Sequence, residues 1–406
     1  MPSNGSTVKR NVDRSAASDL ALRIDYQIAG EAGDVPAASQ MLALPFKLTP
    51  SDVHPFLTLE NYFVAIEKFL LRNHGATLLS ALQARLGSAI SLDTIHRLSI
   101  RSEKHGTLYH IASVDVFTSD ERVKLTVSSA VSKTAKECLR REFQIIQTLS
   151  RSHNLPYLPI VYGQGDVHSP SGHGYGPQET FAMVLSDWFE GFHEWHTTID
   201  QKNGRRRIVV WDHGTTARYL SEEAWCTLLK EASKILTLYY HPATFRQIYP
   251  WHHAAGDFVV NAQDKAIDVR LVTVREYQSI MDAFSTGPID PLIAIVYFFL
   301  NLTVRMRLDR LDGVKDVVWI GDTAVSATVE GFFEAIGHMV RQGKFTLCTV
   351  EALVSLLRAF APEELKGLYQ SLSVLYEEGD PEEYALIRTQ LDRHVSAVWT
   401  ALRAFH

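Results

Sequence analysis

Residues 97–131 read RLSIRSEKHGTLYHIASVDVFTSDERVKLTVSSAV, and residues 133–151 read KTAKECLRREFQIIQTLSR. In the first stretch apolar and polar residues alternate, which is the period of a strand with one buried face. The segments EKHG and TSDER interrupt this alternation with turn-forming residues. In the second stretch apolar residues recur at every third or fourth position. The sequence therefore predicts two or three antiparallel strands followed by one amphipathic helix.

Further elements are predicted on both sides of this stretch. Residues 58–86 have a helical period that is broken at 73–75, where the sequence is NHG, so two helices are expected. Strands are expected within 155–167 and 179–189. The polar N-terminus, residues 1–19, lacks the apolar core of a signal peptide and is expected to be a disordered arm or an edge element.

Beyond residue 190 the helical signal dominates. A long helix is expected over 221–241, whereas FVVN and AIDVRLVTV are expected to form two strands separated by a turn. The run RMRLDRLDG (305–313) is expected to tie the end of a helix to its neighbours through ion pairs. Other helices, two of them beginning at the proline-containing starts APEEL and GDPEEY, are expected over 288–309, 327–342, 349–360, 362–377 and 380–404.

The composition limits the class of protein. The chain has 406 residues, a net charge of −6 and 46% hydrophobic residues, which is enough for a large buried core. The charge gives little support for nucleic-acid binding. The run PLIAIVYFFLNLTV (291–304) is too short for a comfortable membrane span and predicts a buried helix, so no membrane partner is expected. Three widely spaced cysteines, Cys138, Cys226 and Cys348, fit a reducing cytoplasm without disulfides.

The order of these elements resembles the protein-kinase-like fold, especially its aminoglycoside and choline phosphotransferases. LRREFQIIQTL is similar to the family's αC helix, with Glu142 in the place of the glutamate that pairs with a strand lysine. FAMVLSDWFEGFHEWH resembles the strand leading into the hinge, and WHHAAGDFVV resembles the catalytic loop. The resemblance covers roughly residues 95–310. It implies a bilobal α+β fold in which a small antiparallel sheet lobe with an αC-like helix is joined to a larger helical lobe.

The resemblance also implies a domain division. Residues 1–95 would be an N-terminal arm and helical extension. Residues 96–190 would form the kinase-like N-lobe, and residues 191–406 the helical C-lobe with the C-terminal helices.

Aligning the loop WHHAAGDFVV with the family assigns roles to its polar residues. His252 falls at the catalytic aspartate, Asp257 at the magnesium-binding asparagine and Thr273 near the second metal-binding aspartate. His252 and the adjacent His253 are then candidate catalytic residues, and Asp257 is a candidate magnesium ligand. A second alignment takes Asp257 as the catalytic aspartate and Asn261 as the metal ligand. A third interpretation packs the histidines in the core and leaves Asp257 to satisfy loop amides.

Nucleotide binding in this family uses a glycine-rich turn, a strand lysine and the αC glutamate. Their counterparts here are Gly106 in the turn SEKHGTLYH, Lys124 near the start of a predicted strand, and Glu142. ATP and magnesium are the cofactors that the resemblance implies. Glu142, His252 and Asp257 are expected to face one cleft.

Because the sequence departs from the family pattern at several positions, three functions are considered for this chain. A pseudokinase-like protein is favoured by three departures: the strand has no central lysine, the turn has one glycine, and Thr273 replaces a carboxylate. Such a protein would bind nucleotide, have weak or absent phosphotransfer, and serve in binding or regulation. One alternative is an active ATP-dependent phosphotransferase that uses His252 or Asp257. The other, indicated by FHEWH (192–196), is a metal-dependent hydrolase that uses His193, His196, His252, His253 and Asp257.

Overall fold

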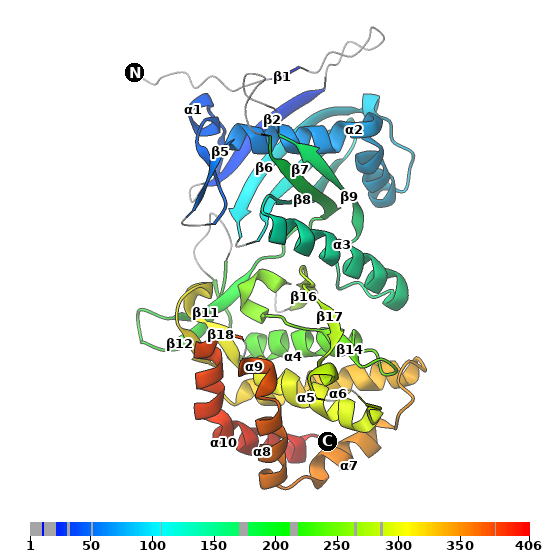
Figure 1. Ribbon diagram of the computed structural model, residues 1–406, viewed down its shortest axis with the longest axis vertical. Coiled ribbons are helices and arrows are strands. Elements are labelled where there is room, and N and C mark those ends of the chain that lie inside the picture. The colour runs from blue at the N-terminus through cyan, green and yellow to red at the C-terminus, as the bar shows by residue number, and fades with distance from the viewer. Residues whose placement is uncertain are drawn as a thin grey trace. The chain divides into compact units, whose positions relative to one another are not determined.

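The chain forms two compact units in the computed structural model (Figure 1). Unit 1 comprises Met1–Arg151 and Pro159–Glu190, and unit 2 comprises Ser152–Leu158 and Gly191–His406. Helices and strands are both abundant and the main sheet is largely antiparallel, so the predicted α+β class is confirmed. The structure describes residues 10–11, 22–30, 33–49, 52–106, 108–169, 178–211, 218–263, 266–284, 287–377 and 379–406.

Unit 1 is built on an eight-stranded sheet. Its central strands β6 (Ile95–His105), β7 (His110–Thr118) and β8 (Arg122–Ala130) form the predicted antiparallel series. β10 (Thr180–Asp187) joins β8, and β9 (Val161–His168) joins β10, both in antiparallel pairs. Beyond β6 lie β2 (Arg23–Gly30), β1 (Arg10–Asn11) and β3 (Gly33–Pro36), of which the last two pair with β2.

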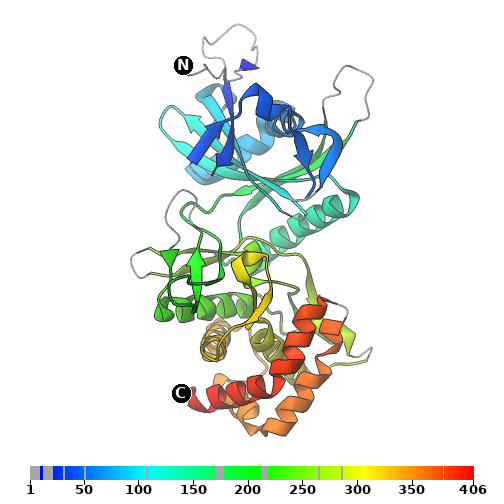
Figure 2. The same cartoon turned by 90° about the vertical axis from the view of Figure 1, so that its left-hand side faces the viewer.

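Two helices cover opposite faces of this sheet (Figures 1 and 2). α2 (Leu59–Leu86) lies over the larger apolar face, because alternation along β6, β7 and β8 sends every second side chain to that side. α3 (Lys133–His153), which the sequence predicts over 133–151, packs on the other face. On this face, Leu139 and Phe143 of α3 pack against three residues of the sheet, Ala130, Ala182 and Val184.

The segment for which an N-terminal arm and helical extension are predicted, residues 1–95, also contributes strands to the main sheet. β2 pairs in parallel with β6, with Ile24 opposite Leu98, so the segment belongs to the sheet of unit 1. The predicted break in the helical segment is confirmed, because Asn73, His74 and Gly75 have φ values of 50°, 55° and 71° inside α2. Smaller elements of unit 1 are α1 (Ser39–Leu42), β4 (Pro45–Lys47), β5 (Val53–Thr58) and η1 (Leu92–Thr94).

Unit 2 is mainly helical, as predicted. The apolar run 291–304 lies in a helix whose residues are mostly buried, and no helix in the described ranges combines the length and apolar character needed to span a bilayer. The segment predicted as one helix over 362–377 forms two. The helices are α4 (Glu222–Leu238), α5 (Pro291–Arg305), α6 (Thr323–Arg341), α7 (Val350–Ala359), α8 (Pro362–Ser371), α9 (Val374–Glu377) and α10 (Pro381–Ala404).

Short strands also occur in unit 2, and sequence periodicity identified only two of them. β15 (Phe258–Asn261) and β16 (Asp268–Leu271) form the predicted antiparallel pair. The other pairings involve strands of two to five residues, too short to show a clear alternation. These are β11 (Trp195–Ile199), β12 (Arg206–Val210), β13 (Arg218–Tyr219), β14 (Arg246–Ile248), β17 (Tyr277–Ser279), β18 (Leu308–Arg310) and β19 (Val317–Trp319). Three short helical turns, η2 (His253–Asp257), η3 (Ile280–Ala283) and η4 (Leu311–Gly313), lie between strands and helices.

The two helices α4 and α6 approach each other closely at one glycine. A Cβ atom on Gly331 of α6 would lie 2.1 Å from the backbone carbonyl oxygen of Lys230 in α4. Backbone atoms cannot rotate away from such a contact, so the packing distance between these helices requires glycine at this position.

We expect Gly331→Ala to lower the free energy of unfolding by about 1–3 kcal/mol, because the added methyl group forces the helices apart. The matched control is Gly367→Ala in α8, where no atom lies within 4 Å of the new methyl group. Removing an exposed helical glycine should stabilise the chain by about 0.5–1 kcal/mol. Urea unfolding of both variants measures the difference, and equal effects would contradict the close approach of α4 and α6.

Candidate functional site

The loop between β14 and β15 carries the polar residues on which the sequence analysis concentrated. Aromatic packing fixes its two ends, since the buried rings of Trp251 and Phe258 meet edge to face with centroids 6.3 Å apart. Gly256 has a φ of 77°, a left-handed conformation that glycine adopts without steric cost. The turn η2 that contains it returns the chain so that Asp257 lies beside the start of the loop.

Asp257 is buried and both of its carboxylate oxygens accept hydrogen bonds. Arg275 donates from Nη1 to Oδ2 at 2.8 Å and from Nη2 to Oδ1 at 2.7 Å. The backbone N–H of His252 also donates to Oδ2 at 2.8 Å, which closes the loop on itself. Paired, charge-assisted bonds of this kind are strong and geometrically specific. A magnesium ion at Asp257 would therefore have to displace a guanidinium group.

His252 is held by a second arginine, from α5. Arg305 donates from Nη2 to the imidazole Nε2 at 3.0 Å and to the backbone carbonyl of Trp251 at 3.2 Å. Because a guanidinium group can only donate, Nε2 must be the accepting nitrogen of a neutral imidazole. Burial, together with the positive charges of Arg305 and Arg275, lowers the pKa of His252 to about 2. Such a group is a poor general base at neutral pH.

The guanidinium of Arg305 is itself buried, with a side chain only 6% exposed. Its counter-charge is Glu383 of α10, whose Oε2 accepts from Nη1 at 2.6 Å. Glu383 is also buried, so the pair joins α5, α10 and the loop through one charged cluster. These contacts confirm the interpretation of RMRLDRLDG as a run that ties a helix to its neighbours.

His253 points into the core of unit 2. Its side chain is completely buried, and burial lowers its pKa despite the opposing effect of the Asp309 carboxylate. Asp309 accepts hydrogen bonds from the Thr197 N–H and hydroxyl and from the Arg310 N–H. This environment matches the interpretation of His253 as a packed core histidine, with Asp309 joining β11 to β18.

The histidines of FHEWH do not assemble a metal centre. His193 pairs through its backbone with Val260, and His196 is buried edge-on against Trp211, where burial lowers its pKa. Throughout the described ranges, no group of three or more His, Cys, Asp or Glu side chains is arranged to hold a metal ion.

The predicted nucleotide-binding residues lie in unit 1. Gly106 donates its N–H to the Tyr109 carbonyl at 2.9 Å in the turn between β6 and β7. The Lys124 ammonium lies 4.4 Å from the ring centroid of Trp188 and 4.0 Å from a carboxylate oxygen of Glu103. Glu142 is buried on α3. The structure thus brings His252, His253 and Asp257 together, whereas a cleft shared with Glu142 stays a prediction.

Arg275, Arg305 and Glu383 were not predicted as partners of the loop. Arg275 follows Thr273 by two residues, in the segment where the resemblance implies a metal-binding carboxylate. Glu383 is in the first turn of α10, where an acidic residue is explained equally well by the helix dipole. Only the three-dimensional structure distinguishes a glutamate that is buried as a counter-ion from an exposed glutamate that interacts with the helix dipole.

Neither a family model nor a curated protein matches this chain.

Removing the buried guanidinium should be costly. We expect Arg305→Met to lower the free energy of unfolding by about 3–5 kcal/mol, because it leaves Glu383 buried without a counter-charge. The double variant Arg305→Met/Glu383→Leu should recover most of this loss. The control Arg310→Met removes an arginine that pairs with Asp380 near the surface and should cost about 1 kcal/mol or less. A double variant as unstable as the single one, measured by urea unfolding, would contradict this account.

The loop histidines predict a pH dependence. Both folded-state pKa values lie below the unfolded value near 6.5, so their stabilising contribution is complete above that pH and is lost as the pH falls below it. Between pH 6.5 and 5 each histidine should reduce the free energy of unfolding by up to about 1.4 kcal/mol per pH unit. In His252→Gln/His253→Gln this slope should be smaller, whereas the exposed-site control His241→Gln should retain it. Identical slopes in urea titrations at several pH values would refute the assignment.

Proposed function

We propose that this chain is a divergent kinase-like protein that has lost phosphotransfer and acts as a binding or regulatory module. The observation that carries the proposal is the paired hydrogen bonding of Asp257 to Arg275. In the resemblance to phosphotransferases this aspartate holds the magnesium position, and here its charge is already neutralised by the protein.

The order of elements within each unit supports the resemblance. In unit 1 the antiparallel strands β6, β7 and β8 are followed by α3 and then by β9 and β10, as a kinase-like small lobe requires. In unit 2 the long helix α4 precedes the loop, and the hairpin β15–β16 follows it. These are the positions that the family gives to the helix before the catalytic loop and to the strands after it.

Phosphoryl transfer depends on positioned groups and on neutralised charge. A catalytic carboxylate must orient the attacking hydroxyl, and two ligands must hold magnesium on the phosphates. Here His252 stands at the first position with its Nε2 occupied by Arg305, and Thr273 stands at the second metal position. The residues of this loop therefore do not fit a magnesium ion, and no transfer step is assigned to them.

Nucleotide is the ligand that the resemblance implies for unit 1. Lys124 and the buried Glu142 would supply the phosphate-anchoring pair of that lobe. The position of the Lys124 ammonium over Trp188 and near Glu103 means that it must be drawn from these neighbours to reach a phosphate. We expect such binding to be weak and independent of magnesium.

Two measurements test the proposal. With ATP and magnesium the chain should hydrolyse no nucleotide above the buffer rate, because no group of three or more His, Cys, Asp or Glu side chains in the described residues is arranged to hold the metal. ATP should raise the melting temperature equally with magnesium or with a chelator. The overturning result is a magnesium-dependent turnover that disappears in Asp257→Asn and survives in the control Asp268→Asn, which alters a half-exposed carboxylate on β16.

A further inference from the structure

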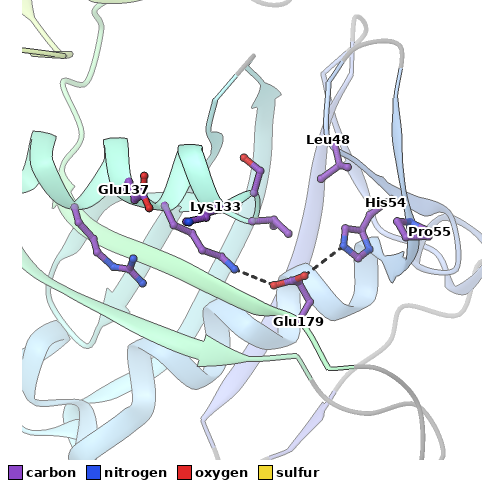
Figure 3. A pocket seen from close by; sticks show the side chains of 10 residues that line it. Leu48, His54, Pro55, Lys133, Glu137 and Glu179 are labelled. Carbon is purple, nitrogen blue, oxygen red and sulfur yellow. Dashed lines mark hydrogen bonds and ion pairs between the residues drawn. The ribbon is translucent and has the colours of Figure 1, made fainter.

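A cavity of about 410 Å³ lies within unit 1 (Figure 3). One wall is the beginning of α3, and the other is formed by His54 of β5 and by Glu179, which precedes β10. Figure 3 shows His54 beside Glu179, with a dashed line marking the contact between them. A volume of this size suits a small metabolite.

Positive charges are concentrated on the α3 wall. Lys133, Lys136 and Arg140 are spaced by three and four residues, which places them on one face of the helix. The Lys136 ammonium donates to Glu179 at 2.8 Å. Arg140 forms a solvent-exposed pair with Asp166, which is weak and exchangeable. Lys133 is exposed and forms no side-chain ion pair within the described part of the chain.

His54 adds a hydrogen-bond donor from the wall opposite α3. Its side chain is only 8% exposed, and its Nδ1 accepts from the Leu57 N–H at 3.1 Å. Burial lowers its pKa, which favours the neutral ring, so the proton must be on Nε2. The nearest partner of Nε2 is the Glu179 carboxylate at 3.8 Å, beyond hydrogen-bond length. The Nε2–H group faces the Glu179 carboxylate across this long polar contact and also lines the cavity, where a ligand oxygen can accept from it.

We propose that this cavity binds a small, soluble phosphomonoester whose phosphate contacts Lys133 and Lys136 and accepts from the Nε2–H of His54. Among the lining residues the three cations exceed the carboxylates of Glu137 and Glu179 by one charge, in a chain whose net charge is −6. Lysine ammonium groups bind phosphate as point charges, and donors from two walls suit a tetrahedral oxyanion better than a planar one.

The rest of the cavity suits the organic part of such a ligand. Leu48, Pro55 and Val131 supply apolar surface beside the charged groups. Pockets for metabolites commonly combine an apolar lining with a few placed polar groups. The site is separate from the nucleotide-anchoring pair of the proposed function, because Lys124 and Glu142 do not line it.

The experiment is a titration of the full chain with inorganic phosphate and with glycerol 3-phosphate, using potassium chloride at equal ionic strength as the reference. Both phosphates should raise the melting temperature beyond chloride, and glycerol 3-phosphate should bind more tightly. Lys133→Gln should weaken binding about tenfold by the loss of one charge-assisted contact. His54→Asn, which keeps an acceptor for the Leu57 N–H but loses the Nε2–H donor, should also weaken it. Arg151→Gln, on the exposed far end of α3, is the matched control and should bind as the wild type does.

Two results would overturn the proposal. One is a response to phosphate that is no larger than the response to chloride. The other is an equal dissociation constant in Lys133→Gln and Arg151→Gln, since Lys133 is exposed and its replacement does not threaten the fold. Vesicles containing phosphatidic acid test whether the phosphate belongs to a lipid. Co-sedimentation that requires Lys133 would replace the soluble ligand by a membrane headgroup, whereas its absence supports the soluble one.

Discussion

The buried guanidinium of Arg305 is the constraint on which the polar loop of unit 2 depends. Removing a charge from water is costly unless a counter-charge and further hydrogen bonds replace the lost hydration. Glu383 supplies the counter-charge, while the Trp251 carbonyl and the His252 imidazole accept hydrogen bonds from Nη2. One side chain thus ties α5 to α10 and, together with burial, lowers the pKa of His252.

Arg275 completes this arrangement from the other side of the loop. Arginine presents a planar fork of donors that matches a carboxylate, so its bond to Asp257 is directional as well as ionic. Together the two arginines occupy the Asp257 carboxylate and the His252 imidazole, the groups that made the loop resemble a catalytic one. The same polar residues that indicate chemistry in the sequence act here as acceptors for fixed internal cations. This is the physical reason for which we propose a binding role in place of a transfer reaction.

Elements with long, regular periods were predictable from sequence. β6, β7, β8 and α3 follow the alternation and the helical period closely, and the Asn73–Gly75 break in α2 follows from turn-forming residues. The short strands β11, β12 and β13 were missed because few residues show any period. For the loop at 250–257, the sequence predicted that polar side chains gather there, but it did not predict which residues they contact. Arg305 and Glu383 are far apart in sequence, so their pairing depends on the packing of α5 and α10.

The parallel pairing of β2 with β6 constrains the order in which unit 1 folds. Parallel strands cannot be joined by a tight turn, and here the connection from Gly30 to Ile95 contains α2. Contacts between residues distant in sequence form slowly, because the intervening chain must first be closed into a loop. During synthesis from the N-terminus, β2 emerges together with β1 and β3 but well before β6. The parallel pairing that joins β2 to the central strands must therefore wait until residues 95–105 have been made.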